Sequence, residues 1–249
     1  MKILVCISNV PDTTTKVRFS NGGTRFDPGG VQWIINPWDE LALTRAVELK
    51  EDASTPVSTV TVLTVGPPTA EPTLRKALAI GADDAIRVDC EAQDAYSVAA
   101  RIAEVAGNRD DDLILCGIES SDYNNSSVGG MLSEMLEIPS VSAISSLRTE
   151  NDKVLIIRDI DGGKEEVSVP LPFVGIVQKG IAREPRIAAM RGIMMARKKP
   201  LQVVPAAEVE PLTRYEEFKL PEPKLPCRMI DAGNVRELVN LLQNEAKVI

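Results

Sequence analysis

Short apolar runs alternate with amphipathic stretches along most of the chain. The apolar runs lie at residues 3–7, 57–65, 86–88, 113–116 and 173–177. The continuously apolar runs at 3–7 and 113–116 are typical of strands that are covered on both faces of a parallel sheet, and the run at 57–65 is rich in the β-branched residues that favour strands. Apolar residues recur at helical spacing within residues 37–50, 74–78, 95–106 and 128–136. This alternation predicts right-handed βαβ units in an α/β fold, with an open, mostly parallel, doubly wound, Rossmann-like sheet.

Two departures from this pattern are expected to add small antiparallel elements. Residues 154–160 and 165–169 alternate apolar and polar positions around an Asp-Gly-Gly turn at 161–163, which predicts a hairpin. Residues 17–19 and 31–35 predict short strands around two Gly-Gly turns.

The last fifty residues differ in composition from the rest. Residues 201–232 are rich in Pro and Glu and have little periodicity, so they predict an extended arm. A final helix carries Val235, Leu238, Val239 and Leu242 on one face. We therefore divide the chain into an α/β domain at 1–200 and an arm with a terminal helix at 201–249. The arm could lie on a partner chain or cover its own domain, and the first alternative predicts a lone chain of poor stability.

Candidate chemistry lies in the polar loop that follows the strand at 113–116. That strand ends at Gly117, and a helix is expected to begin near residues 125–127. The free N–H groups of Ser126, Ser127 and Val128 would point at an anion such as a phosphate, although such residues also cap ordinary helices. Gly66 ends another strand, and we expect it beside Gly117 along the carboxyl edge of the sheet, where ligands bind in this class of fold.

Composition excludes several kinds of chemistry. The 249 residues include no histidine, which rules out Ser–His and Cys–His nucleophile pairs and His-ligated zinc. The four cysteines lack any CxxC spacing, so no metal site is expected. A net charge of −8 argues against nucleic acid as a partner, and the chain shows no signal peptide or membrane span. We expect a cytoplasmic protein that does not insert into a membrane.

Several motifs in a fixed order closely resemble the beta subunit of electron transfer flavoproteins. The motifs lie at residues 10–12, 33–40, 75–83, 159–163, 184–186, 193–194 and 198–199. Asn36 and Pro37 belong to the second of them. The resemblance extends through residues 1–200 and is more specific than any single motif.

The resemblance implies half of an alpha–beta heterodimer that carries electrons and is not itself an enzyme. The alpha subunit would hold most of the redox-active FAD. Electrons would pass from acyl-CoA and related dehydrogenases, as in fatty acid β-oxidation, to a membrane quinone oxidoreductase. In most members the beta subunit holds a structural AMP, and in electron-bifurcating members it holds a second, redox-active FAD. A free nucleotide-binding domain of the stress-protein type is a more remote alternative.

Matched by position, the resemblance implies a set of nucleotide contacts. They are Cys6, Asn36, Val65, Gly66, Gly117, Asp122, Asn125, Ser126, Ser127 and Val128. Asn36 could equally serve turn chemistry before Pro37. The sequence departs from the family at residues 118–121, Tyr123, Ser126 and Ser127. These differences leave open which side chains contact the nucleotide, and therefore whether the nucleotide is AMP or FAD.

Two further groups of residues are implied to face other molecules. Thr13 and Trp38 would lie near the FAD held by the alpha subunit, although Trp38 could instead serve as packing at the helix entry. Within the recognition segment at 184–199, Ile187, Met190 and Met194 would form one helical stripe, with Met190 as the anchor in a dehydrogenase pocket. The alternative is that this stripe packs on its own core.

Overall fold

A nine-stranded sheet forms the centre of the fold in the computed structural model, which describes residues 1–150, 153–224 and 226–249. The strand order is β11-β10-β9-β12-β8-β1-β6-β7-β13. The strands are β1 (Lys2–Cys6), β6 (Thr59–Val65), β7 (Asp84–Asp89), β8 (Leu113–Gly117), β9 (Ser140–Glu150), β10 (Lys153–Ile160), β11 (Gly163–Val169), β12 (Phe173–Val177) and β13 (Leu201–Pro205). Among these strands β10 alone runs antiparallel to the rest. The predicted mostly parallel sheet is confirmed.

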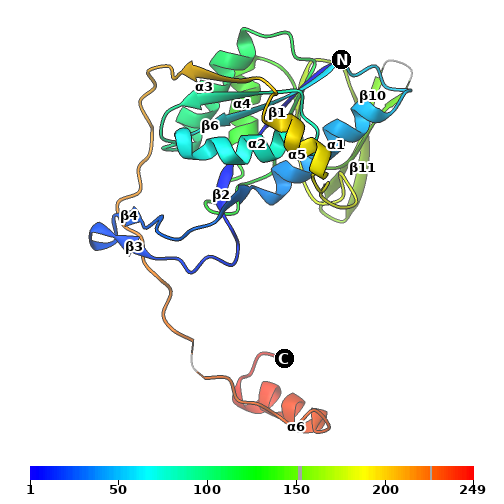
Figure 1. Cartoon of the computed structure of the whole chain (residues 1–249). Coiled ribbons are helices and arrows are strands. Elements are labelled where there is room, and N and C mark those ends of the chain that lie inside the picture. The colour runs from blue at the N-terminus through cyan, green and yellow to red at the C-terminus, as the bar shows by residue number, and fades with distance from the viewer. Residues whose placement is uncertain (151–152, 225) are drawn as a thin grey trace.

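Helices cover both faces of the sheet, as a doubly wound fold requires. They are α1 (Pro37–Glu51), α2 (Glu71–Ile80), α3 (Ala95–Gly107), α4 (Val128–Leu136) and α5 (Met190–Ala196). A further helix, α6 (Val235–Asn240), contains no buried residue. One core layer joins α1, α2 and α5 to the sheet, and the other joins α3 and α4 to the opposite face. Figure 1 shows α1, α2 and α5 together on one side.

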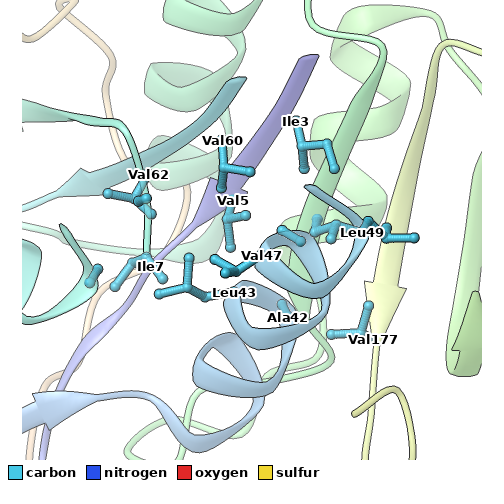
Figure 2. Close-up of a cluster of buried hydrophobic side chains, with 14 of the residues drawn as sticks. Ile3, Val5, Ile7, Ala42, Leu43, Val47, Leu49, Val60, Val62 and Val177 are labelled. Carbon is cyan, nitrogen blue, oxygen red and sulfur yellow. The ribbon is translucent and has the colours of Figure 1, made fainter. Parts of the chain in front are cut away.

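The alternation of side chains along β1 accounts for the two layers. Ile3 and Val5 point into the layer under α1, whereas Leu4 and Cys6 point into the layer under α3 and α4. Figure 2 shows Val5 near Val47 of α1, and Ile3 and Leu43 belong to the same cluster. Because both faces are buried, the sequence of the strand is continuously apolar.

The antiparallel part of the sheet is larger than the sequence indicated. The predicted hairpin is present as β10 and β11, but it continues into β9, a strand of 11 residues that we did not predict. The pairing of β9 shifts register, and Ala143 within it has a φ of +57°. The buried Val141, Ile144 and Leu147 therefore recur every third residue rather than every second, which hides the strand pattern.

Residues 9–35 form a polar excursion beyond the carboxyl edge of the sheet. Its elements are β2 (Asn9–Pro11), β3 (Phe19–Ser20), the 3₁₀ turn η1 (Asn21–Gly23), β4 (Arg25–Phe26) and β5 (Trp33–Ile35). The strands expected at 17–19 and 31–35 are thus shorter than predicted. A second 3₁₀ turn, η2 (Pro68–Ala70), precedes α2.

The arm begins later than residue 201. Residues 201–205 form β13, which pairs in parallel with β7 at the edge of the sheet, so the expected boundary at residue 200 falls short of the last strand. Prolines at both ends made this strand resemble linker. Beyond it, residues 206–224 and 226–232 contain no helix or strand, and Leu225 lies outside the described residues.

The terminal helix is present, and it lies away from the body of the molecule (Figure 1). It consists of α6 followed by the π-helical turn η3 (Leu241–Glu245), and neither segment contains a buried residue. Across residues 1–150, 153–224 and 226–249, no helix is long and apolar enough to span a membrane.

Candidate functional site

The strand order places a crevice between β1 and β8. The chain moves from β1 toward β6 and β7 on one side and then returns to β8 on the other, so the order reverses at this point. In open α/β sheets ligands bind at the carboxyl ends of the strands where such a reversal occurs. A cavity of about 580 Å³ lies there.

Most of the predicted nucleotide residues line this cavity. They are Cys6, Val65, Gly66, Gly117, Asp122, Asn125, Ser126, Ser127 and Val128. The structure therefore brings together strand ends and a loop that are more than a hundred residues apart in the sequence. Among the described residues that line the cavity, Asn36 is absent, although it was expected there.

Asn36 instead holds the loop that follows β8. The side chain is buried, and its Nδ2 donates to the carbonyl of Glu119 at 2.8 Å. Its Oδ1 accepts from the N–H of Ser121 at 3.2 Å. Because Pro37 fixes the chain at the start of α1, Asn36 positions the cavity wall from behind.

Asp39 is a second buried residue of this turn, and we did not predict it from the sequence. Its Oδ2 accepts from Ser8 N at 2.7 Å and its Oδ1 from Gly117 N at 2.9 Å. The carboxyl group thus joins the end of β1 to the end of β8 through the first turn of α1. Burial raises the pKa of Asp39 to about 6, against the opposing effect of these hydrogen bonds. The available signal was an acid in the first turn after an Asn-Pro helix start.

Gly117 is required by close approach and not by backbone conformation. A Cβ atom at this position would overlap Oδ1 of Asp39 and would lie 2.8 Å from Cβ of Trp38. The glycine that ends β8 therefore allows the N-terminus of α1 to close against the strand.

The floor of the cavity is formed by two free thiols on neighbouring strands. Cys6 ends β1 and Cys116 lies near the end of β8, and both are buried. The hydrogen bond with Cys116, together with burial, raises the pKa of the Cys6 thiol well above its usual range. The floor is consequently uncharged and suits a flat, weakly polar group.

The loop between β8 and α4 is shaped by its own polar contacts. Asn124 and Ser126 have φ angles of +51° and +50°, and Ser126 Oγ lies 3.1 Å from Glu119 Oε2. Ser127 Oγ donates to Asn125 O at 2.6 Å. In the described residues, no side chain caps α4, and its first turn contains no acid. The N–H groups of that turn therefore remain free to bind an anion.

Aromatic side chains complete the outer wall, and the sequence analysis did not anticipate them. Phe26 and Trp33 come from the N-terminal excursion, Tyr123 from the loop after β8, and Tyr215 from the arm. Thr13 and Trp38 do not line the cavity in the described part of the chain; Thr13 is exposed and Trp38 is half-buried. Their predicted place near a flavin stays a prediction.

The recognition segment presents its apolar side chains to solvent. The exposed fractions are 91% for Ile187, 75% for Met190 and 69% for Met194. Helix α5 begins at Met190, so the predicted stripe is only partly helical and Ile187 precedes it. The alternative that these side chains pack on the core of their own domain does not hold. Burial of Ala196 provides the core contact of α5.

Several contacts hold α5 against α2. Arg75 donates from Nη1 to the carbonyls of Ala196 and Lys199, each at 2.8 Å. A Cβ on Gly192 would overlap the carbonyl oxygen of Ala79, so only glycine permits this approach. The exposed side chains therefore project from a fixed base.

Comparison with known proteins agrees with this architecture. The model of the electron transfer flavoprotein domain matches residues 24–209. The chain is similar to the electron transfer flavoprotein subunit beta of Bacillus subtilis, with 34% identity over 263 residues that cover 100% of both chains. The chain belongs to the electron transfer flavoprotein family as a beta subunit.

The chain is also similar to two other proteins over most of its length. The electron transfer flavoprotein subunit beta of Bradyrhizobium diazoefficiens is 32% identical over the full length of both chains. The acryloyl-CoA reductase electron transfer subunit gamma of Anaerotignum propionicum is 32% identical, over 88% of this chain and 84% of its own. The resemblance seen in the sequence motifs is thereby confirmed at the level of the family.

Proposed function

We propose that this beta subunit pairs with an alpha subunit, binds AMP in the cavity between β1 and β8, and serves as an electron carrier. The observation that carries the proposal is the gathering of nine of the ten expected nucleotide residues around one cavity. A cavity of about 580 Å³ lies within the range of roughly 300–1,000 Å³ that small-molecule sites occupy.

Two features of the lining support binding of a nucleotide. The free N–H groups at the start of α4 would receive the phosphate, and the uncharged thiol floor would lie against the adenosine. Five acids line the cavity, and two of them are held by backbone N–H groups, because Asp39 accepts two such groups and Asp94 accepts three.

The alpha subunit is the proposed partner of the terminal helix and of the end of the arm that precedes it. Val235, Leu238 and Val239 of α6 are exposed, as is Met229 just before it. An apolar helix face on a segment without buried residues is expected to gain its stability from a second surface. The FAD would be held mainly by the alpha subunit, with Thr13 and Trp38 near its ring. An unchanged flavin spectrum in Trp38→Ala would argue against that placement of Trp38.

The recognition segment supplies the proposed docking surface for electron donors. Met190 and Met194 are flexible apolar side chains, and Arg191, Arg197 and Lys198 add positive charge around them. Acyl-CoA and related dehydrogenases would dock here, and electrons would leave to a quinone oxidoreductase. A cytoplasmic location is part of this proposal.

Electron transfer through the assembled complex tests the function. The chain is co-expressed with its alpha subunit, and flavin absorbance is followed after addition of an acyl-CoA dehydrogenase with its substrate. We expect the complex to contain flavin and to be reduced only when both dehydrogenase and substrate are present. A complex whose flavin stays oxidised under these conditions would contradict the proposal.

A further inference from the structure

We propose that residues 212–218, here called the strap, close the nucleotide cavity, and that Tyr215 on the strap retains the bound nucleotide. The inference rests on the proposed nucleotide function and adds a part of the chain that lies far from the sheet. In Figure 1 the arm descends from β13 and passes beside the hairpin of β3 and β4. Three separate contacts hold this passage.

The first contact is made by Asp94, at the start of α3. Its Oδ1 caps the helix by accepting from Ser97 N at 2.8 Å. Its Oδ2 accepts from the N–H groups of Leu212 and Thr213 at 2.8 and 2.9 Å. One carboxylate therefore fixes both the rim of the cavity and the beginning of the strap, since Asp94 itself lines the cavity. Burial alone would raise the pKa of Asp94, but the hydrogen bonds from Ser97, Thr213 and Leu212 outweigh it and lower the pKa to about 2. This anchor thus remains charged at neutral pH.

The second contact is aromatic and lies at the cavity itself. Tyr215 stacks on Tyr123 with ring centroids 4.8 Å apart, and both rings line the cavity. Asn125 Nδ2 lies 3.4 Å from the hydroxyl oxygen of Tyr215. Tyr215 is therefore a part of the cavity wall that comes from the arm.

The third contact joins the end of the strap to the N-terminal excursion. Phe218 N donates to Gly23 O at 2.7 Å, and the ring of Phe218 stacks on Phe19 at 5.3 Å. Tyr215 and Phe218 also stack on each other, at 5.5 Å. Two of the three tyrosines and two of the four phenylalanines in the chain thus form one continuous stack across the opening.

The contacts of the strap are sufficient to hold it over the cavity, but they are few enough for the strap to detach. It forms no helix or strand, and its contacts are a few hydrogen bonds and stacked rings that are exposed at Tyr123 and Tyr215 and half-buried at Phe19 and Phe218. A nucleotide would enter with the strap displaced and would be enclosed when Tyr215 returns to Tyr123. Removal of that ring is therefore expected to speed release more than it changes the fold.

The test measures release of AMP from the purified alpha–beta complex. The complex is loaded with radiolabelled AMP, and loss of label is followed after a chase with unlabelled AMP. Tyr215→Ala is expected to release AMP roughly threefold to tenfold faster, the range for loss of stacked aromatic contacts. Tyr215→Phe keeps the ring and should release at nearly the wild-type rate. Leu220→Ala removes an exposed apolar side chain just beyond the strap and should also match the wild type.

A second readout needs no nucleotide. Alkylation of Cys6 and Cys116 by iodoacetamide, resolved by peptide mass spectrometry in the nucleotide-free complex, reports access to the cavity floor. It should be faster in Tyr215→Ala than in the wild type and in Leu220→Ala.

The outcomes separate the strap from the nucleotide function. Equal release and equal alkylation in Tyr215→Ala and wild type would overturn the strap while leaving AMP binding intact. Failure of the wild-type complex to hold AMP, with alkylation unaffected by Tyr215→Ala, would overturn both. If the wild-type complex does not hold AMP but Tyr215→Ala is alkylated faster than the wild type, the strap still closes the cavity, and only AMP as the ligand is overturned.

Discussion

Single residues at the start of α1 shape the cavity. Asn36 and Asp39 lie three positions apart, and their polar groups reach the loop after β8 and the ends of β1 and β8. The motif around Pro37 indicated a helix start and a possible ligand contact. The role of Asn36 depends on its hydrogen bonds with Glu119 and Ser121, which are more than eighty residues away. The local sequence around Pro37 cannot predict these contacts.

Asp39 should make stability depend on pH. Its folded-state pKa of about 6 lies above the ordinary 3.8, so the folded protein binds the proton more tightly than the unfolded chain. Protonated Asp39 adds about 3 kcal/mol to the free energy of unfolding. This contribution is fully present below about pH 4 and is lost as the pH rises through 6. Asp39→Asn, which cannot ionise, should lose this dependence. Its melting temperature relative to the wild type should therefore increase between pH 4.5 and pH 7.

Asp12→Asn supplies a control with the reverse sign. The hydrogen bonds from Thr14 lower the pKa of the exposed Asp12 carboxyl group, so its contribution is present at neutral pH and is lost on acidification. Identical pH profiles for Asp39→Asn and wild type would show that Asp39 is not the group that titrates.

Two glycines that are both close to the cavity should respond oppositely to alanine. A Cβ on Gly117 would overlap Asp39, so Gly117→Ala should destabilise the fold by about 1–3 kcal/mol and release the nucleotide. Gly130, in the first turn of α4, has nothing within 4 Å of the same atom. Gly130→Ala should therefore stabilise by roughly 0.5–1 kcal/mol. Urea unfolding measures both; a neutral Gly117→Ala would remove the close-approach argument.

Helices and strands could be predicted from the sequence where the apolar residues of an element follow one regular pattern. Strands such as β1 and β8 are short, apolar on both faces and bounded by polar residues, so their pattern survives without knowledge of neighbours. Strand β9 was not predicted because its irregular register breaks the two-residue period of its side chains. Strand β13 was not predicted because it depends on pairing with β7, which lies far away in the sequence. The aromatic wall was missed for a similar reason. Tyr123 and Tyr215 are 92 positions apart, and only the course of the arm joins them.

Helix α5 provides a test of docking that is separate from folding. Met190→Ala removes an exposed anchor and should cost about 1–3 kcal/mol of docking free energy, which slows reduction at low dehydrogenase concentration. Flavin content and melting temperature should not change. Val203→Ala, at an exposed position of β13, is the matched control. A Met190→Ala complex that melts early but accepts electrons normally would assign Met190 to the fold.

At the scale of the whole molecule, the body and the terminal helix serve different purposes. The body contains the core layers and the cavity, whereas α6 buries nothing within this chain. The strap lies between them, so the same arm that closes the cavity leads to the segment proposed to bind the alpha subunit. Composition indicated an arm that needs another surface, and the exposed side chains of α6 are consistent with that interpretation.

Truncation after Asp231 should separate assembly from folding. The shortened chain should melt at the same temperature as the full chain when each is studied alone, and it should aggregate less because Val235, Leu238 and Val239 are absent. Its association with the alpha subunit should weaken roughly tenfold or more, as judged by titration. Unchanged association would place the partner surface elsewhere.

A cavity between β1 and β8 that holds AMP within a flavin-containing heterodimer must release this AMP on denaturation. The most direct measurement is chromatography of the nucleotides released when the purified alpha–beta complex is denatured. We expect one FAD and one AMP per complex, with the AMP lost in Gly117→Ala and the FAD retained. Two FAD molecules per complex, or FAD without AMP, would contradict it.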